Sequence, residues 1–318
     1  MEEPTRNGSG GRHNGSVTTS GSPPHGTGPR PAGLVPSVAG GTPLWSSYVA
    51  LGDSFTEGLW DVVGGPAPVT AERAEPGLVL RGWADRLAEH LAAHHTATGA
   101  GDEPFRYANL AVRGRLLGPI VREQVPVALA MRPDLVSIIG GGNDILRPAV
   151  RVDAIAAELE RAVAALRRSG SDVLLGTGWD SLGSPIVERT RHRTSLLNAH
   201  VWSIARRHGC YVLDAWGMRA LHDWRLWAGD RIHLTAEGHR RVADGALVAL
   251  GLEPSDPGWD RPLPPRAPLG KAAAARADAE WFRLHAWPWA TRRLRRRSSG
   301  DERRPKRPDL TPLEPPRL

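Results

Sequence analysis

The chain has 318 residues, enough for one sizeable α/β domain or two small ones. Its single cysteine, Cys210, excludes an intramolecular disulfide and a zinc site built from several cysteines. The formal charge of +7 is concentrated at the C-terminus, because residues 255–318 carry the whole excess and residues 44–254 carry about −1. A near-neutral central part argues against nucleic acid as its partner.

Residues 1–43 are rich in Gly, Ser, Pro and Thr and show no hydrophobic period, so we expect a disordered segment. The chain opens Met1-Glu2-Glu3-Pro4 and lacks the charged-then-apolar layout of a secretory signal. No stretch approaches the ~18 consecutive apolar residues of a membrane span. These features predict a cytoplasmic protein.

Between residues 44 and 254, short apolar runs alternate with longer amphipathic ones, which predicts one α/β domain. The expected strands are Tyr48–Leu51, Arg106–Val112, Leu135–Ile139, Asp172–Gly176 and Tyr211–Asp214. The expected helices are Gly82–His95, Leu116–Met131, Val152–Arg168, Pro185–His208 and Thr235–Leu250. Nearly continuous apolar strands between helices indicate a parallel sheet that is covered on both faces.

Residues 255–318 form a Pro/Arg-rich C-terminal tail in which residues 272–285 could form a helix. A solvated tail is the simplest interpretation. The Arg292–Arg297 cluster could instead attach the protein weakly to an anionic membrane, and the Trp-containing part could pack back on the domain. Because the candidate catalytic residues all precede this tail, we expect removal of residues 290–318 to change activity by a few-fold at most.

Polar residues follow the predicted strands at the edge where parallel sheets place their chemistry. Ser54 comes after the first strand in Gly52-Asp53-Ser54, at a sharp exit where a hydroxyl can point into a cleft. An isolated serine of this kind is more often a cap or turn residue. Ser54 therefore needs partners before it can be interpreted as a nucleophile.

Asp230 and His233 lie three residues apart in a loop before the last predicted helix. On a turn, this spacing can place the carboxylate against one imidazole nitrogen and leave the other to accept a serine proton. Gly114 follows the second strand and can offer a backbone N–H to an oxyanion. Asn143 follows the third strand and can donate its amide to the same oxyanion.

The ordered blocks resemble those of the GDSL/SGNH hydrolase family. The segments ALGDSFTEG (Ala50–Gly58) and DRIHLTAEGHRRVA (Asp230–Ala243) are similar to the first and last blocks of that family, and Gly114 and Asn143 stand between them. The resemblance implies a three-layer α/β/α sandwich with a five-stranded parallel sheet in the flavodoxin-like order 2-1-3-4-5.

The resemblance also implies the role of each residue. Ser54 is the nucleophile, His233 the base and Asp230 the residue that orients it. Ser54, Gly114 and Asn143 donate to the oxyanion. The expected activity is that of a metal-independent esterase, lipase or acylhydrolase that forms an acyl-serine intermediate. The alternative is a binding or scaffold protein that keeps this fold without turnover.

No cofactor is expected, because the chain has no P-loop, G-x-G-x-x-G or H-E-x-x-H motif. No metal site is expected either. Several tryptophans fall after the fourth and fifth strands and could form an aromatic wall for an acyl chain or a sugar ring, although packing is the simpler interpretation. These residues are Trp179, Trp216, Trp224 and Trp227. The expected partner is a small-molecule, lipid or sugar ester.

Overall fold

The computed structural model describes residues 45–65, 78–99, 102–182, 187–267, 270–288, 291, 300–301 and 303–314. The chain divides into residues 1–31 and 32–318, and all described residues belong to the second unit. The predicted disordered segment 1–43 and the Arg292–Arg297 cluster lie outside the described residues. None of the helices that the structure describes is long and apolar enough to cross a membrane.

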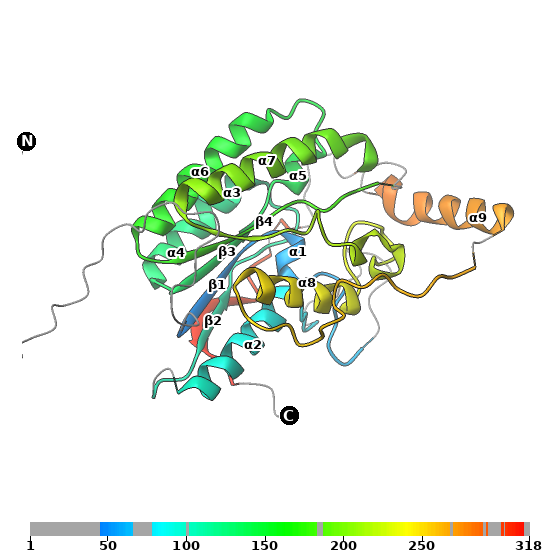
Figure 1. The fold of residues 1–318 in the computed structure, drawn as a ribbon. Coiled ribbons are helices and arrows are strands. Elements are labelled where there is room, and N and C mark those ends of the chain that lie inside the picture. Colours follow the sequence, from blue (N-terminus) through cyan, green and yellow to red (C-terminus); the bar gives the residue numbers. More distant parts are fainter. Residues whose placement is uncertain are drawn as a thin grey trace, which may run out of the picture. The chain divides into compact units, whose positions relative to one another are not determined.

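The centre of the second unit is a six-stranded sheet in the order β5-β4-β3-β1-β2-β6 (Figure 1). The strands are β1 (Ser47–Gly52), β2 (Arg106–Asn109), β3 (Leu135–Ile139), β4 (Asp172–Gly176), β5 (Tyr211–Leu213) and β6 (Arg307–Pro312). The first five run parallel, in the predicted order 2-1-3-4-5. Their carboxyl ends therefore meet at one edge of the sheet.

Helices cover both faces of the sheet because alternate strand residues point to opposite sides. In β1, Tyr48 and Ala50 pack on the face of α2 (Trp83–Thr98) and α8 (Ala236–Ala249). Val49 and Leu51 pack on the other face. That face is covered by α3 (Leu117–Pro119), α4 (Val125–Met131), α6 (Val152–Arg168) and α7 (Arg191–His208) (Figure 1). The predicted three-layer sandwich is confirmed.

The helix predicted over Leu116–Met131 is interrupted. A π-helical turn, Ile120–Gln124, separates α3 from α4, and the Val125 N–H donates to the Ile120 carbonyl. Pro126 follows and has no N–H to continue the regular helical ladder, which accounts for the wide turn at this point.

The sixth strand corrects the prediction of five. β6 comes from the predicted tail and pairs antiparallel with β2, with Tyr107 opposite Thr311. The Arg307 guanidinium donates to the Tyr107 carbonyl at 2.8 Å. The segment also contributes a helix, α9 (Lys271–Trp281), where one was expected over 272–285. The C-terminal region is thus joined to the sheet through β6.

Candidate active site

Ser54 begins a short helix, α1 (Ser54–Glu57), directly after β1. Asp53 caps this helix, because its side chain accepts the Phe55 N–H at 3.1 Å. Gly52 allows the tight exit from the strand: a Cβ at this position would lie 2.5 Å from the Thr56 hydroxyl. The Gln124 amide bonds both the N–H and the carbonyl of Gly52. Gln124 thereby fixes the end of the strand that presents Ser54.

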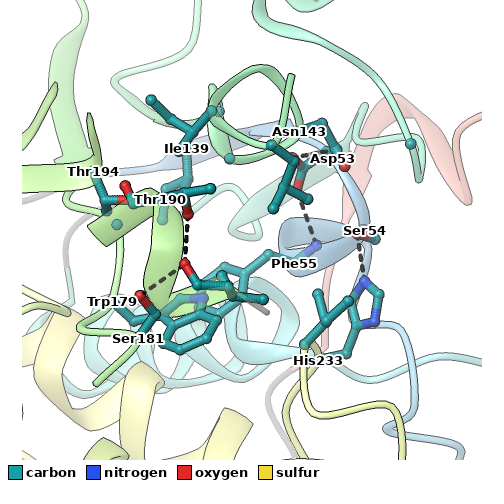
Figure 2. A pocket seen from close by; sticks show the side chains of 18 of the residues that line it. Asp53, Ser54, Phe55, Ile139, Asn143, Trp179, Ser181, Thr190, Thr194 and His233 are labelled. Atoms are coloured by element: carbon teal, nitrogen blue, oxygen red, sulfur yellow. Dashed lines mark hydrogen bonds between the residues drawn. The ribbon is translucent and has the colours of Figure 1, made fainter. Parts of the chain in front are cut away.

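The structure brings together the residues predicted to form the triad, although Ser54 and His233 lie 179 positions apart. His233 Nε2 is 2.7 Å from Ser54 Oγ (Figure 2). His233 Nδ1 is 2.6 Å from Asp230 Oδ2. The other carboxylate oxygen, Oδ1, accepts the N–H groups of Ile232 and His233 at 3.0 Å each. With Nδ1–H donating to the carboxylate, Nε2 is left to accept the serine proton.

The electrostatics of the pair favour an anionic Asp230 beside a basic imidazole. Burial alone would raise the pKa of Asp230, but the charge and hydrogen bonds of His233 lower it to about 2. Burial alone would lower the pKa of His233. The Asp230 carboxylate has the opposite and larger effect, so the pKa of His233 lies above its ordinary value. The carboxylate thus stabilises the imidazolium that would form when His233 takes a proton.

The other two predicted oxyanion donors, Gly114 and Asn143, line the same cavity as Ser54. Gly114 has a φ of +73°, a left-handed conformation that favours glycine. Asn143 lies in the helical turn α5 (Gly142–Ile145) just after β3. Its Nδ2 donates to Asp53 Oδ2 and to the Arg115 carbonyl, both at 3.0 Å. These contacts hold the amide in one rotamer at the cavity wall.

Asp53 is itself buried, and burial raises its pKa to about 6. Its carboxylate accepts hydrogen bonds from the Phe55 N–H and the Asn143 amide. Asp53 therefore links the cap of the nucleophile's helix to the Asn143 side chain.

Sequence reasoning missed two tryptophans that hold Asp230 from distant parts of the chain. Trp60 has a φ of +80° and donates its indole N–H to Asp230 Oδ2 at 2.6 Å. Trp281 donates its indole N–H to the Asp230 main-chain carbonyl at 2.9 Å. The signal for Trp60 was its position just after the first block. Trp281 lies 51 residues beyond Asp230 and carried no motif.

Glu57, the last residue of α1, forms a buried ion pair. Its carboxylate accepts the backbone N–H of Arg113 at 2.8 Å, and the Arg113 guanidinium lies 2.6 Å from it. Lys306 donates to the Glu57 carbonyl at 2.6 Å and also to Asp85. The loop that ends at Gly114 is therefore tied to α1, and α1 is in turn tied to Lys306.

A cavity of about 770 Å³ opens in front of Ser54. Figure 2 shows it extending from Ser54 and His233 towards Ile139, Thr194 and Trp179. Most of its lining beyond the polar site is aliphatic, aromatic or glycine. The aliphatic side chains include Leu116, Ile139, Ile145, Leu146, Val187, Leu197 and Val201. Such a wall suits an apolar group next to the scissile bond.

The aromatic wall was predicted from four tryptophans. Among the described lining residues, Trp179 is the one member of the four. Trp227 packs against it in a tilted arrangement with ring centroids 4.2 Å apart, and Trp224 packs edge-on to Trp179. Trp216 lies beneath the Arg191 guanidinium. The assignment of the four tryptophans as substrate contacts stays a prediction.

Within the part of the chain that the structure describes, no group of at least three His, Cys, Asp or Glu side chains is arranged to hold a metal ion.

The fold and the site together define a class of α/β hydrolytic proteins in which a serine follows the first strand of a parallel sheet. The model of the GDSL-like lipase/acylhydrolase family matches residues 50–241, which include Ser54, Gly114, Asn143, Asp230 and His233. The chain belongs to this family. Ester hydrolysis is the general activity that membership supports. A comparison with curated protein sequences gives no significant match.

Solved structures show the same fold. LAE5, described as an α/β hydrolase enzyme from the metagenome of Lake Arreo, is 23% identical with a TM-score of 0.51, over 65% of this chain and 95% of that one. A variant of Axe2, an acetyl xylan esterase from Geobacillus stearothermophilus, is 21% identical with a TM-score of 0.52. The match covers 66% of this chain and 97% of that one. The shared region leaves out about a third of this chain.

Proposed function

We propose that this protein is a metal-independent carboxylic ester hydrolase that works through an acyl-serine intermediate. The observation that carries the proposal is the continuous chain from Ser54 Oγ to His233 Nε2, 2.7 Å, and from His233 Nδ1 to Asp230 Oδ2, 2.6 Å. A serine hydroxyl is a weak nucleophile unless a base removes its proton, and this chain supplies that base together with the group that orients it.

In the first half-reaction, Ser54 Oγ attacks the ester carbonyl carbon while its proton passes to His233 Nε2. The carbonyl oxygen becomes an oxyanion, which the backbone N–H groups of Ser54 and Gly114 and the Asn143 amide stabilise. When the intermediate collapses, His233 returns its proton to the departing alkoxide and an alcohol leaves. The acyl group stays bonded to Ser54.

In the second half-reaction, a water molecule attacks the acyl-serine carbonyl and gives its proton to His233. The tetrahedral intermediate then breaks to the Ser54 oxygen, which recovers the proton from His233, and the carboxylic acid leaves. Asp230 stays ionised throughout and stabilises the imidazolium in both halves. The aliphatic cavity wall suggests that the acyl group of the substrate is apolar.

Hydrolysis of a short p-nitrophenyl ester by the wild-type protein and by Ser54→Ala tests this function. Loss of the nucleophile costs on the order of 10⁴–10⁶ in kcat, so we expect the variant to be near background. Circular dichroism of both proteins checks that the fold is retained. A folded wild-type protein that hydrolyses none of a panel of esters of graded chain length would favour the non-catalytic binding or scaffold alternative.

A further inference from the structure

The C-terminal segment Gly270–Pro288 lies against the loop that carries Asp230, although the family match ends at residue 241. It consists of α9 and a π-helical turn, Phe282–Ala286. Trp281 is 9% exposed, and no other described side chain of α9 is buried. The buried contact of this helix with the hydrolase domain is therefore made by one indole ring.

Three contacts join this segment to the Asp230 loop. The Trp281 indole N–H donates to the Asp230 carbonyl at 2.9 Å. The Arg231 guanidinium lies 5.2 Å from the centre of the Trp281 ring, within range of a cation–π contact. Arg231 also forms an ion pair of 2.7 Å with Asp278, one turn earlier on α9. All three contacts fall on the two residues that begin the Asp230–His233 turn.

The Asp230–His233 turn needs such support because of its backbone. Arg231 has a φ of +58°, a left-handed conformation that a residue with a Cβ adopts at an energetic cost. A residue in this conformation persists when its surroundings hold it in place. From the interior, Trp60 holds the Asp230 carboxylate, and from the outside Trp281 holds its main-chain carbonyl.

We propose that Trp281 is a positioning residue of the catalytic centre: by bonding the Asp230 carbonyl and stacking on Arg231, it fixes the turn that aims the Asp230 carboxylate at His233. The proposal rests on the proposed hydrolase function. A small rotation of this turn would lengthen the contact between Asp230 and His233 Nδ1. Since Asp230 acts only through His233, the effect falls on the chemical step rather than on substrate binding.

The test compares Trp281→Phe with Trp287→Phe in the full chain. The first variant keeps an aromatic ring in the buried position and removes the indole N–H. The second is the matched control, because Trp287 is 60% exposed in the same segment. We expect kcat for a p-nitrophenyl ester to fall about tenfold in Trp281→Phe with KM changed less than about twofold, whereas Trp287→Phe stays at the wild-type level.

The pH profile separates positioning from a general loss of stability. A carboxylate that moves away from His233 raises the pKa of the imidazole less, so the acid limb of kcat/KM should shift to lower pH in Trp281→Phe. The ionisable groups that act on His233 are Asp230 and Asp53, which raise its pKa, and Arg113, which lowers it. His285, from the C-terminal segment, also lines the cavity near Asp230. The variants leave all of these side chains in place.

Asp278→Asn provides a second, independent variant. Asp278 is 58% exposed, so its substitution should not prevent folding. It removes the ion pair with Arg231 and leaves the indole bond, and we expect a kcat reduction of about two- to threefold with a shift of the acid limb in the same direction. If Trp281→Phe does not fold, the result for Asp278→Asn decides whether contacts from α9 position the Asp230–His233 turn.

Wild-type kcat and an unmoved acid limb in both variants would overturn the positioning role. Failure of the proposed function looks different, because Ser54→Ala would then keep the activity of the wild-type protein. The two ideas can thus fail separately.

Discussion

At the scale of single residues, Asn143 has to redirect its amide when an oxyanion forms. In the structure its Nδ2 donates to Asp53 and to the Arg115 carbonyl. We expect Asn143→Ala to lower kcat by roughly 10²–10³, about 3–4 kcal/mol, because the oxyanion exists near the transition state and not in the bound substrate. Steady-state kinetics measures this. A change confined to KM would show that Asn143 binds the ground-state ester.

His233 sets the pH dependence of the activity. The imidazole must be neutral to accept the Ser54 proton, and its folded-state pKa lies above 6.5. kcat/KM should therefore rise with pH as His233 loses its proton, with a midpoint above 6.5. In Asp230→Asn the midpoint should move to lower pH, because the charge that raises the pKa of His233 is gone.

Asp53 titrates in the same range, since its pKa lies at about 6. An Asp53→Asn variant distinguishes the two groups. An acid limb that belongs to His233 should persist in this variant and shift to lower pH, because the Asp53 carboxylate also raises the pKa of His233, whereas a limb that belongs to Asp53 should disappear. A wild-type midpoint well below 6.5 would contradict the assignment of His233 as the base.

At the scale of elements, β6 and Lys306 reverse the expectation that the last residues are dispensable. Lys306 donates to the carbonyls of Glu57 and Leu80 and pairs with Asp85. We expect Lys306→Met to lower the free energy of unfolding by about 2 kcal/mol, because three acceptors lose a charged donor. Urea denaturation measures this change. The matched control is Arg304→Met at an exposed neighbouring position, for which we expect no measurable change.

Removal of residues 290–318 should accordingly lower the stability and the activity together, since it deletes β6 and Lys306. The few-fold effect expected from the sequence alone is thus replaced by a larger loss. An unchanged unfolding midpoint in the truncated protein would show that the pairing of β6 with β2 contributes little in solution.

Strands such as β1 and β3 could be predicted because they are buried on both faces and are largely apolar in sequence. β6 could not, because its sequence, Arg307-Pro308-Asp309-Leu310-Thr311-Pro312, has two prolines and no apolar alternation. Proline is tolerated there because β6 is an edge strand, and an edge strand needs its N–H groups on one side alone. Its pairing with β2 depends on main-chain groups, and these are the same in every sequence, so the side chains do not indicate it.

At the scale of the whole molecule, the part of the site that could be predicted consists of the triad and the oxyanion donors. Ser54, Gly114, Asn143, Asp230 and His233 stand in blocks whose order and chemistry could be interpreted together. Trp60 and Trp281 act through Asp230 from 170 and 51 positions away. A single indole N–H donor has no sequence pattern of its own, so its role emerges from the fold.

The proposed mechanism needs no metal ion. Activity towards a p-nitrophenyl ester should be unchanged after incubation with EDTA and desalting, because proton transfer from Ser54 to His233 and charge stabilisation by N–H donors complete the chemistry. Strong loss of activity that a divalent ion restores would refute this. A parallel sample incubated without EDTA controls for the handling.

Covalent labelling with an alkyl p-nitrophenyl phosphonate shows whether Ser54 is the nucleophile, because phosphonylation requires an activated serine and leaves a stable adduct. Mass spectrometry of the intact protein and of its peptides locates the adduct. We predict one phosphonyl group per chain, on Ser54, with concurrent loss of esterase activity. Ser54→Ala should remain unlabelled, and His233→Ala should react far more slowly. Stoichiometric labelling of another residue, or esterase activity that persists while Ser54 stays unmodified, would show that Ser54 is not the nucleophile.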